Sequence, residues 1–124
     1  WWVPNMAEFS IERKEDWDWT MMIAQPEVVT AEWVERAKVE AAEKKDLPAL
    51  AQVRFEAFHE GLCVQLQHTG PYSTEGPNIA RLHAWMEVEG YVPNGKHHEI
   101  YLSDARRTEP TRLKTVLRQP MRKE

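Results

Sequence analysis

The sequence lacks most features that mark disulfide-stabilised, membrane or nucleic-acid-binding proteins. Its 124 residues contain one cysteine, Cys63, so no internal disulfide can form, which agrees with a reducing cytoplasm. No apolar run approaches the roughly 20 residues that a membrane helix needs, and nothing resembles a signal peptide. Acidic residues outnumber basic ones by 20 to 16, so no basic surface for nucleic acid is predicted. We therefore expect a cytoplasmic protein that contacts neither membrane nor nucleic acid directly.

Sequence motifs for metals, nucleotides and covalent catalysis are also missing. The five histidines show no HxxxH or His-x-His spacing, and one cysteine cannot form a CxxC pair. There is no Gly-x-Gly-x-x-Gly or Walker loop, and Ser73 does not lie in a nucleophile elbow. Cys63 has no histidine or basic neighbour in sequence to activate it, which favours a structural thiol. We expect neither a metal nor a cofactor.

The composition is that of one small globular domain with a high number of tryptophans. Hydrophobic residues make up 42% and charged residues 29% of the chain, which is ordinary for a globular protein. A chain of this length forms one core. Six tryptophans are many for such a domain. Trp17 and Trp19 share one face of a predicted strand, where they either pack in the core or line a pocket for flat ligands; both alternatives stay open.

Apolar periodicity, caps and turns predict an α+β fold, with an antiparallel sheet and two helices on one side. Thr30 is the expected N-cap of the first helix. The predicted elements, in order, are a strand at Trp17–Ile23, a helix at Ala31–Lys45, a hairpin of Val53–Phe58 and Leu62–His68, a helix at 76–89, a strand around Glu99 and a last strand at Leu113–Leu117.

The strand that follows Gly95 alternates between two kinds of face. It carries His98, Ile100 and Leu102 on one side, and His97, Glu99 and Tyr101 on the other. We expect Ile100 and Leu102 to pack under the second helix, and Glu99 and Tyr101 to face a cleft. A carboxylate beside apolar strand residues is costly to desolvate. It either sits on the sheet surface, paired with a lysine or arginine, or it has a function.

Two motifs resemble the hallmarks of a known family. They are His68-Thr69-Gly70-Pro71-Tyr72, and Glu99-Ile100-Tyr101-Leu102-Ser103-Asp104 followed by Arg107-Thr108, Pro110, Leu113-Lys114-Thr115 and Gln119-Pro120. Together they resemble the GyrI-like (gyrase-inhibitor-like) small-molecule-binding family, although Ala105 stands where relatives commonly carry proline. The resemblance implies an SHS2-type fold of two similar strand-helix-strand-strand halves. We expect residues 1–124 to be a single GyrI-like domain, its second half complete and its N-terminal half largely missing, with that half or a homodimer partner completing it.

The resemblance implies two alternative functions. Related domains are drug-sensing parts of multidrug-responsive transcription regulators and bind planar hydrophobic or cationic molecules, but no helix-turn-helix is visible in this sequence. Free-standing members that resemble this chain most, in Trp1-Trp2, Asp18-Trp19-Thr20 and Lys96–Leu102, are associated with hydrolysis of strained cyclopropane rings in DNA-alkylating natural products, a form of detoxification. These additional motifs favour the enzyme over a module that only sequesters or senses small molecules.

The resemblance also implies the site residues. Glu99 matches the family's pocket glutamate and would deprotonate a water. Tyr101 would donate to the developing oxyanion from a hydroxyl roughly 6–7 Å further along the strand, although another tyrosine or a tryptophan N–H can take this role and Tyr101 can equally be a packing residue. The expected ligand-binding residues are Trp1, Trp2, Trp17, Trp19, His68, Tyr72 and His97, the last as a neighbour rather than a catalyst.

Overall fold

The computed structural model describes residues 1–3 and 13–124. They divide into two compact units. The larger unit is formed by Trp1–Thr20 together with Glu60–Glu124, and the smaller unit by Met21–His59. In the described part of the chain, no helix combines the length and the apolar character that crossing a bilayer requires.

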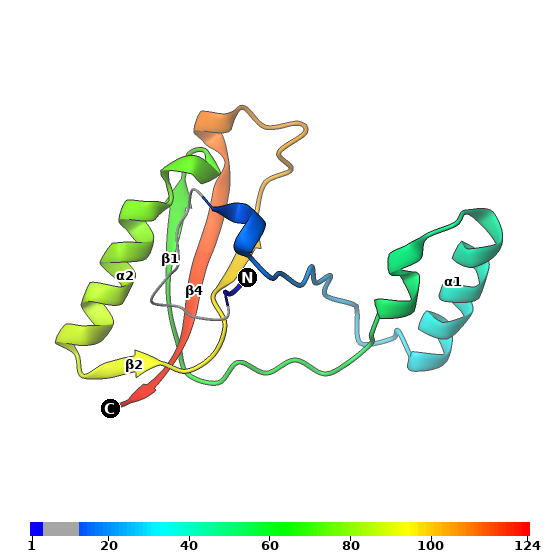
Figure 1. Ribbon diagram of the computed structural model, residues 1–124, viewed down its shortest axis with the longest axis horizontal. Helices are drawn as coiled ribbons and strands as arrows, with labels where there is room; N and C mark the ends of the chain where they lie inside the picture. Colours follow the sequence, from blue (N-terminus) through cyan, green and yellow to red (C-terminus); the bar gives the residue numbers. More distant parts are fainter. Residues whose placement is uncertain (4–12) are drawn as a thin grey trace. The chain divides into compact units, whose positions relative to one another are not determined.

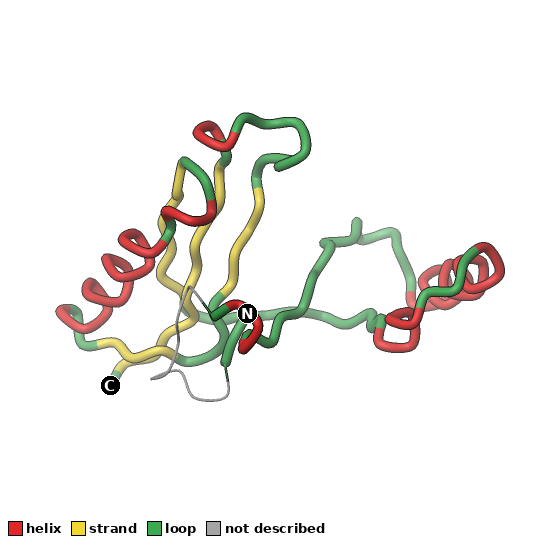
Figure 2. Tube along the Cα trace, turned by 45° about the horizontal axis from the view of Figure 1, so that its top comes forward, coloured by secondary structure: helices red, strands yellow, loops and turns green. Residues whose placement is uncertain are grey.

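The long strand β4 (Lys114–Lys123) organises the four-stranded antiparallel sheet of the larger unit. β1 (Cys63–Thr69) pairs with one edge of β4, while β2 (Tyr91–Pro93) and β3 (His98–Tyr101) pair with different stretches of its other edge. Figure 1 labels β1, β2 and β4, and Figure 2 shows the strands side by side in yellow. β4 is therefore the hydrogen-bonding partner of all three other strands.

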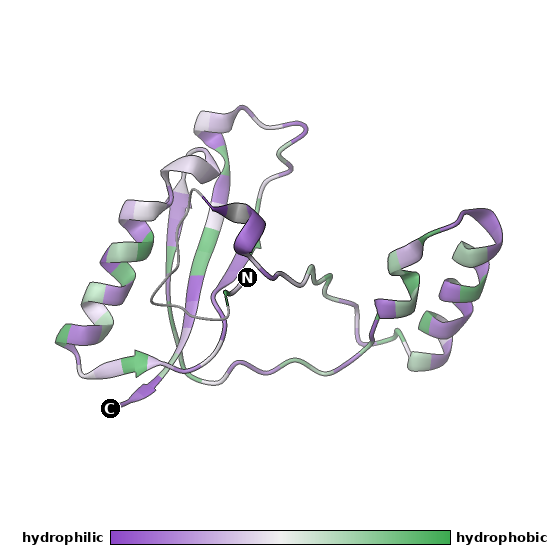
Figure 3. Cartoon of the chain, viewed as in Figure 1, coloured by the Kyte–Doolittle hydropathy of each residue, from purple (hydrophilic) through white to green (hydrophobic). Residues whose placement is uncertain are grey.

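The helix α2 (Gly76–Val88) covers one face of this sheet (Figure 1). Pro77 stands in its first turn, where the missing N–H costs no hydrogen bond. Leu82 and Met86 are the buried residues of α2, and they pack against Leu117 of β4. The rest of the core consists of Met121 with the partly buried Val64, Leu66, Ile79 and Tyr91. Figure 3 shows apolar residues, in green, recurring along α2 and in the middle of β4.

The strand register places Glu99 on the face that α2 covers. Leu117, in the core beneath α2, pairs with Leu66 of β1 and with Glu99 of β3. Residues directly opposite each other in a sheet point to the same face. Tyr101, two residues after Glu99, shares this face. The apolar row beneath the helix therefore continues, one strand further, into a carboxylate.

The prediction that Ile100 and Leu102 pack under the second helix is wrong. Ile100 pairs with Val116, on the face opposite Leu117, and Leu102 is 55% exposed. Alternation predicts which side chains share a face, and this part of the prediction agrees with the register. It does not predict which face a helix covers, because that depends on the apolar residues of the neighbouring strands.

Two predicted strands are wrong, although the predicted α+β class is confirmed. Among the described residues, Trp17–Ile23 forms no strand and pairs only through a bridge between Asp18 and Trp2, closed by backbone hydrogen bonds of 2.9 and 2.8 Å. Val53–Phe58 forms no strand, and β1 pairs with β4 instead of forming a hairpin with it. An alternating sequence supplies side chains for a sheet face, but a strand also needs a partner for its backbone.

The smaller unit contains α1 (Ala31–Lys44), close to the predicted bounds. Its N-cap is Thr30, as predicted, whose hydroxyl accepts the backbone N–H of Trp33 at 3.4 Å. Lys38 pairs with Glu35 at 3.0 Å on the helix surface. No side chain of α1 is buried, so cap and surface pairs contribute more to this helix than a core does.

Replacing Leu117 by alanine should destabilise the larger unit by about 2–5 kcal/mol, the usual cost of a cavity at a buried leucine. The matched control is Leu62→Ala, because Leu62 is 57% exposed. Its effect should stay within about 0.5 kcal/mol. Urea unfolding of both variants measures the difference, and equal losses would contradict the core described above.

Candidate functional site

Glu99 lies within β3, and each of its carboxylate oxygens accepts a hydrogen bond from a neutral donor. Trp1 donates its indole N–H to Oε1 at 2.7 Å, and Tyr101 donates its hydroxyl to Oε2 at 2.9 Å. Only 11% of the Glu99 side chain is exposed. An ionised carboxylate has about four acceptor positions. Two of them therefore remain for a ligand or a water molecule.

Five rings gather beside Glu99, and we call them the aromatic cluster. Its members are Trp1, Trp17, Tyr72, His97 and Tyr101. Trp1 stacks on Trp17 with ring centroids 4.9 Å apart and planes at 23°, and its ring lies 4.4 Å from that of His97. The Tyr72 and Tyr101 rings lie 5.3 Å apart. Rings arranged in this way offer flat faces and edges to a planar ligand.

No lysine or arginine in the described part of the chain pairs with Glu99. The nearest imidazole nitrogen, His97 Nε2, lies 3.7 Å from Glu99 Oε1. Burial lowers the pKa of His97 to about 3, with positive charge at neighbouring groups acting in the same direction, so this ring is neutral at neutral pH. Its two nitrogens have no hydrogen-bond partner among residues 1–3 and 13–124. No side-chain cation of the described residues therefore pairs with Glu99, although the α-ammonium of Trp1 interacts with it electrostatically.

Glu60 provides a comparison within the same unit. Its side chain is 9% exposed, close to the value for Glu99, but Arg118 donates to it at 2.9 Å and His98 Nδ1 lies 3.0 Å away. Burial acts to raise the pKa of Glu60, and the hydrogen bond of Arg118 with the contact of His98 outweighs this effect and holds the pKa below its usual value. Among the described residues, one little-exposed carboxylate, Glu60, is thus paired with side-chain cations, and another, Glu99, is not.

Both tyrosines of the aromatic cluster hold their protons firmly. Desolvation raises the pKa of Tyr101, and the charge and hydrogen bond of Glu99 raise it further. Desolvation also raises the pKa of Tyr72, to which the charges of Glu75 and Glu99 contribute. Both phenols therefore remain hydrogen-bond donors up to alkaline pH. Because 60% of Tyr101 is exposed, its ring is also accessible to a ligand.

His68, a predicted ligand-binding residue, is part of a hydrogen-bonded turn. Its Nδ1 lies 2.9 Å from the side-chain amide of Asn78, and its Nε2 lies 3.2 Å from the carbonyl of Pro71. A carbonyl only accepts, so Nε2 carries the proton and Nδ1 accepts from Asn78. Gly70 has φ +137°, and a Cβ there would come within 3.3 Å of His68. The motif therefore connects β1 firmly to the start of α2, where Tyr72 lies.

Trp2 and Trp19 do not join the aromatic cluster. The ammonium of Lys96 lies 3.3 Å from the ring centroid of Trp2, a cation–π contact, and the backbone of Trp2 pairs with Asp18. Trp19 is 67% exposed and has no ring contact with another described residue. Their role in ligand binding remains a prediction, whereas Trp1, Trp17, Tyr72, His97 and Tyr101 are brought together beside Glu99.

Glu75 is a residue of this region that the sequence analysis did not single out. It precedes the first residue of α2, it is buried, and its charge contributes to the raised pKa of both Tyr72 and Tyr101. The signal in the sequence was weak, because an acidic residue before a helix is ordinary.

Among the described residues, no group of three or more histidine, cysteine or acidic side chains is suited to hold a metal ion.

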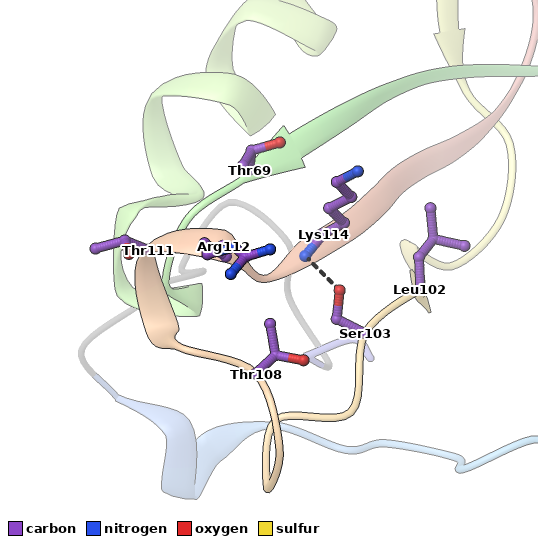
Figure 4. A pocket seen from close by; sticks show the side chains of 7 residues that line it. All are labelled: Thr69, Leu102, Ser103, Thr108, Thr111, Arg112 and Lys114. Atoms are coloured by element: carbon purple, nitrogen blue, oxygen red, sulfur yellow. Dashed lines mark hydrogen bonds between the residues drawn. The ribbon is translucent and has the colours of Figure 1, made fainter.

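A cavity on the larger unit does not include Glu99 or Tyr101 in its lining. It has a volume of about 460 Å³ and lies where β1, β4 and the connection between β3 and β4 meet (Figure 4). The cleft expected at Glu99 and Tyr101 therefore stays a prediction.

Comparison with protein families assigns the chain. The GyrI-like small molecule binding domain matches residues 12–122. The chain belongs to this family. The resemblance seen in His68–Tyr72 and in Glu99–Asp104 is thereby confirmed. The comparison with curated proteins gives no match.

Solved structures support the same fold. An uncharacterized conserved protein from Listeria innocua is 40% identical with a TM-score of 0.84, and the match covers 98% of this chain and 60% of that one. Two further crystal structures, each of a hydrolase from Listeria innocua, are 42% identical with TM-scores of 0.66 and 0.65. They cover 79% of this chain, and 52% and 50% of their own chains. The chain thus spans between half and 60% of the length of these relatives.

His97 should make the protein less stable in acid. Its pKa is about 3 in the folded protein and 6.5 when exposed, so between these values the unfolded chain binds a proton that the folded protein does not. Stability should therefore fall as the pH drops from about 6.5 towards about 3. Urea unfolding across this range should show a shallower pH dependence for His97→Gln than for the unaltered protein. The exposed His59→Gln serves as control, and an NMR titration of His97 with an ordinary pKa would contradict the assignment.

Proposed function

We propose that this chain binds planar aromatic molecules at the aromatic cluster and hydrolyses strained cyclopropane rings of DNA-alkylating natural products, a detoxification. The observation that carries the proposal is the set of contacts around the Glu99 carboxylate. Two neutral donors hold the carboxylate, no side-chain cation of the described residues pairs with it, and stacked rings lie beside it. Membership of a small-molecule-binding family supports the ligand-binding part of the proposal, and 42% identity to hydrolases of Listeria innocua supports the hydrolysis.

The aromatic cluster would position the substrate. A flat ring system gains contact area by stacking on tryptophan and tyrosine, which are rigid and lose little entropy on binding. Holding the reacting carbon next to Glu99 converts an encounter with water into a reaction within one complex, and such positioning supplies a large part of a typical rate enhancement. The exposed ring of Tyr101 and the stacked pair of Trp1 and Trp17 are the expected contact surfaces.

Glu99 would act as the general base. In a cyclopropane conjugated to a quinone-like carbonyl, water attacks a ring carbon, one ring bond breaks, and its electron pair moves to the carbonyl oxygen. Glu99 takes a proton from the attacking water, and the carbonyl oxygen gains a proton to become a phenol. Two acceptor positions of the carboxylate stay open beside the bonds from Trp1 and Tyr101, so one of them can receive the water proton.

The donor to the developing oxyanion needs a different geometry from the one expected. The Tyr101 hydroxyl does not extend along the strand away from Glu99; it turns back and donates to Oε2 at 2.9 Å. Tyr101 therefore first holds the base in place. Tyr72, whose ring lies 5.3 Å from that of Tyr101 and whose raised pKa keeps it protonated, is the better candidate for the oxyanion donor.

Replacing Glu99 by glutamine should lower turnover by a factor of about 10²–10⁴, because the amide keeps the shape but cannot accept a proton. Binding of a neutral flat ligand should change little. The control is Glu60→Gln, the same chemical change at a carboxylate of similar exposure that is paired with Arg118. Turnover is followed by chromatography of the ring-opened alcohol. Normal turnover of Glu99→Gln would reject the catalytic role.

A flat aromatic dye should quench tryptophan emission in a saturable way at about 1–100 μM, the range of moderate small-molecule affinities. The quenching should be largely lost in Trp1→Phe, because Trp1 both stacks on Trp17 and contacts Glu99. Trp33→Phe is the control, since Trp33 is exposed on α1 in the smaller unit. Saturable quenching that depends on Trp33 and not on Trp1 would place the binding site elsewhere.

The second candidate is a module that binds and sequesters small molecules without reaction. The lack of a side-chain cation paired with Glu99 among the described residues favours it for cationic ligands, because a planar cation would gain both ring contact and charge pairing. In that case Glu99→Gln should weaken cationic ligands much more than neutral ones, and no product should form with either protein.

A further inference from the structure

The cavity of about 460 Å³ lies on the other side of the sheet from Glu99. Three of its lining residues form one row across three strands: Thr69 pairs with Lys114, and the backbone N–H of Leu102 donates to the carbonyl of Lys114 at 3.0 Å. Lys114 precedes Thr115, which shares the face of Leu117, so the row points away from α2. The remaining lining residues, shown in Figure 4, come from the loop between β3 and β4: Ser103, Thr108, Thr111 and Arg112.

The hydroxyls that line this cavity have protons to donate. Ser103 Oγ accepts the backbone N–H of Lys114 at 3.1 Å, so its lone pair is used while its O–H is not (Figure 4). Thr69 Oγ1 lies 3.5 Å from the amide nitrogen of Gln67 and accepts from it in the same way. The backbone N–H of Thr108 donates to the carbonyl of Asp104 at 3.0 Å, but no described residue accepts a hydrogen bond from the hydroxyl of Thr108 or Thr111. The lining residues therefore include four hydroxyl groups, two of which already accept a hydrogen bond.

The two cations of the cavity are not paired with acids in the described part of the chain. Neither Arg112 nor Lys114 takes part in an ion pair there, although the whole sequence has more acidic than basic residues. Asp104, at the start of the loop, is already paired. The Arg106 guanidinium donates to its carboxylate in two hydrogen bonds of 3.0 Å, and Arg107 Nε lies 3.9 Å from its Oδ2. Glu109 is exposed and does not line the cavity.

We propose that this cavity binds the phosphate group of a small soluble molecule. A guanidinium fork and an ammonium supply the charge, and hydroxyls around them supply donors for several oxygens of a tetrahedral anion. A carboxylate has only two oxygens in one plane and would leave most of these donors unused. The volume exceeds that of a phosphate and falls in the usual range for small-molecule sites, so the cavity has room for the rest of a phosphate ester, with Leu102 as an apolar wall.

The test is a titration of the unaltered protein with inorganic phosphate, a sugar phosphate and acetate, at constant ionic strength, followed by calorimetry and by backbone NMR shifts. Both phosphates should bind saturably with a dissociation constant of about 1 mM or lower, and should shift the signals of Ser103, Thr108 and Lys114. Arg112→Gln and Lys114→Gln should each weaken binding about tenfold, the loss expected for one charge-assisted contact. Ser103, Thr108, Arg112 and Lys114 all lie away from Glu99. The outcome of this test is therefore independent of the proposed hydrolysis.

Arg106→Gln is the matched control, because it removes the same charge from the same loop at a residue paired with Asp104. It should retain binding within about twofold. Equal weakening by Arg106→Gln would show a general charge effect and overturn the proposal. So would acetate binding as tightly as phosphate, or the absence of saturable shifts at about 10 mM phosphate. A sugar phosphate that binds much more weakly than inorganic phosphate would overturn the assignment of a phosphate ester.

Discussion

The pairing of β4 with β1 and β3 is the constraint on which the region around Glu99 depends. In the observed register Leu117 stands between Leu66 and Glu99, so one row across the sheet is apolar for two strands and acidic on the third. A slip of β3 by one residue would turn Glu99 to the opposite face and bring Ile100 towards α2. The burial of Leu117 beneath α2 therefore fixes the direction of the carboxylate as well as the position of the helix.

The same register separates two kinds of electrostatics. On the α2 face, Glu99 is held by neutral donors and stands beside a neutral imidazole. On the other face, β4 contributes Arg118, which neutralises Glu60, and Lys114, which has no acidic partner among the described residues. One strand thus supports an acidic site on one side and a basic cavity on the other, and alternation keeps the two apart by the thickness of the sheet.

Features with local signals could be predicted from the sequence, and features that need a distant partner could not. The two helices, the Thr30 cap and the shared face of Glu99 and Tyr101 follow from short-range patterns. The strands expected at Trp17–Ile23 and Val53–Phe58 did not form because, within residues 1–3 and 13–124, the first pairs only at the bridge from Asp18 to Trp2 and the second pairs with no strand. The bond from Trp1 to Glu99 spans 98 positions of sequence, so periodicity could not indicate it, and only the family resemblance brought Trp1 into consideration.

The treatment of polar groups near Glu99 is the strongest argument that this region has a function. Burying an imidazole without hydrogen bonds, beside a carboxylate that no side-chain cation of the described residues pairs with, costs free energy of folding. The chain can avoid that cost, because Glu60 is paired with Arg118 and His98, which lie on the opposite face of the sheet from Glu99. Local departures of this kind from full pairing are expected where a ligand or a water completes the hydrogen bonds. A bound molecule that donates to Glu99 and hydrogen-bonds to His97 would recover this free energy on binding.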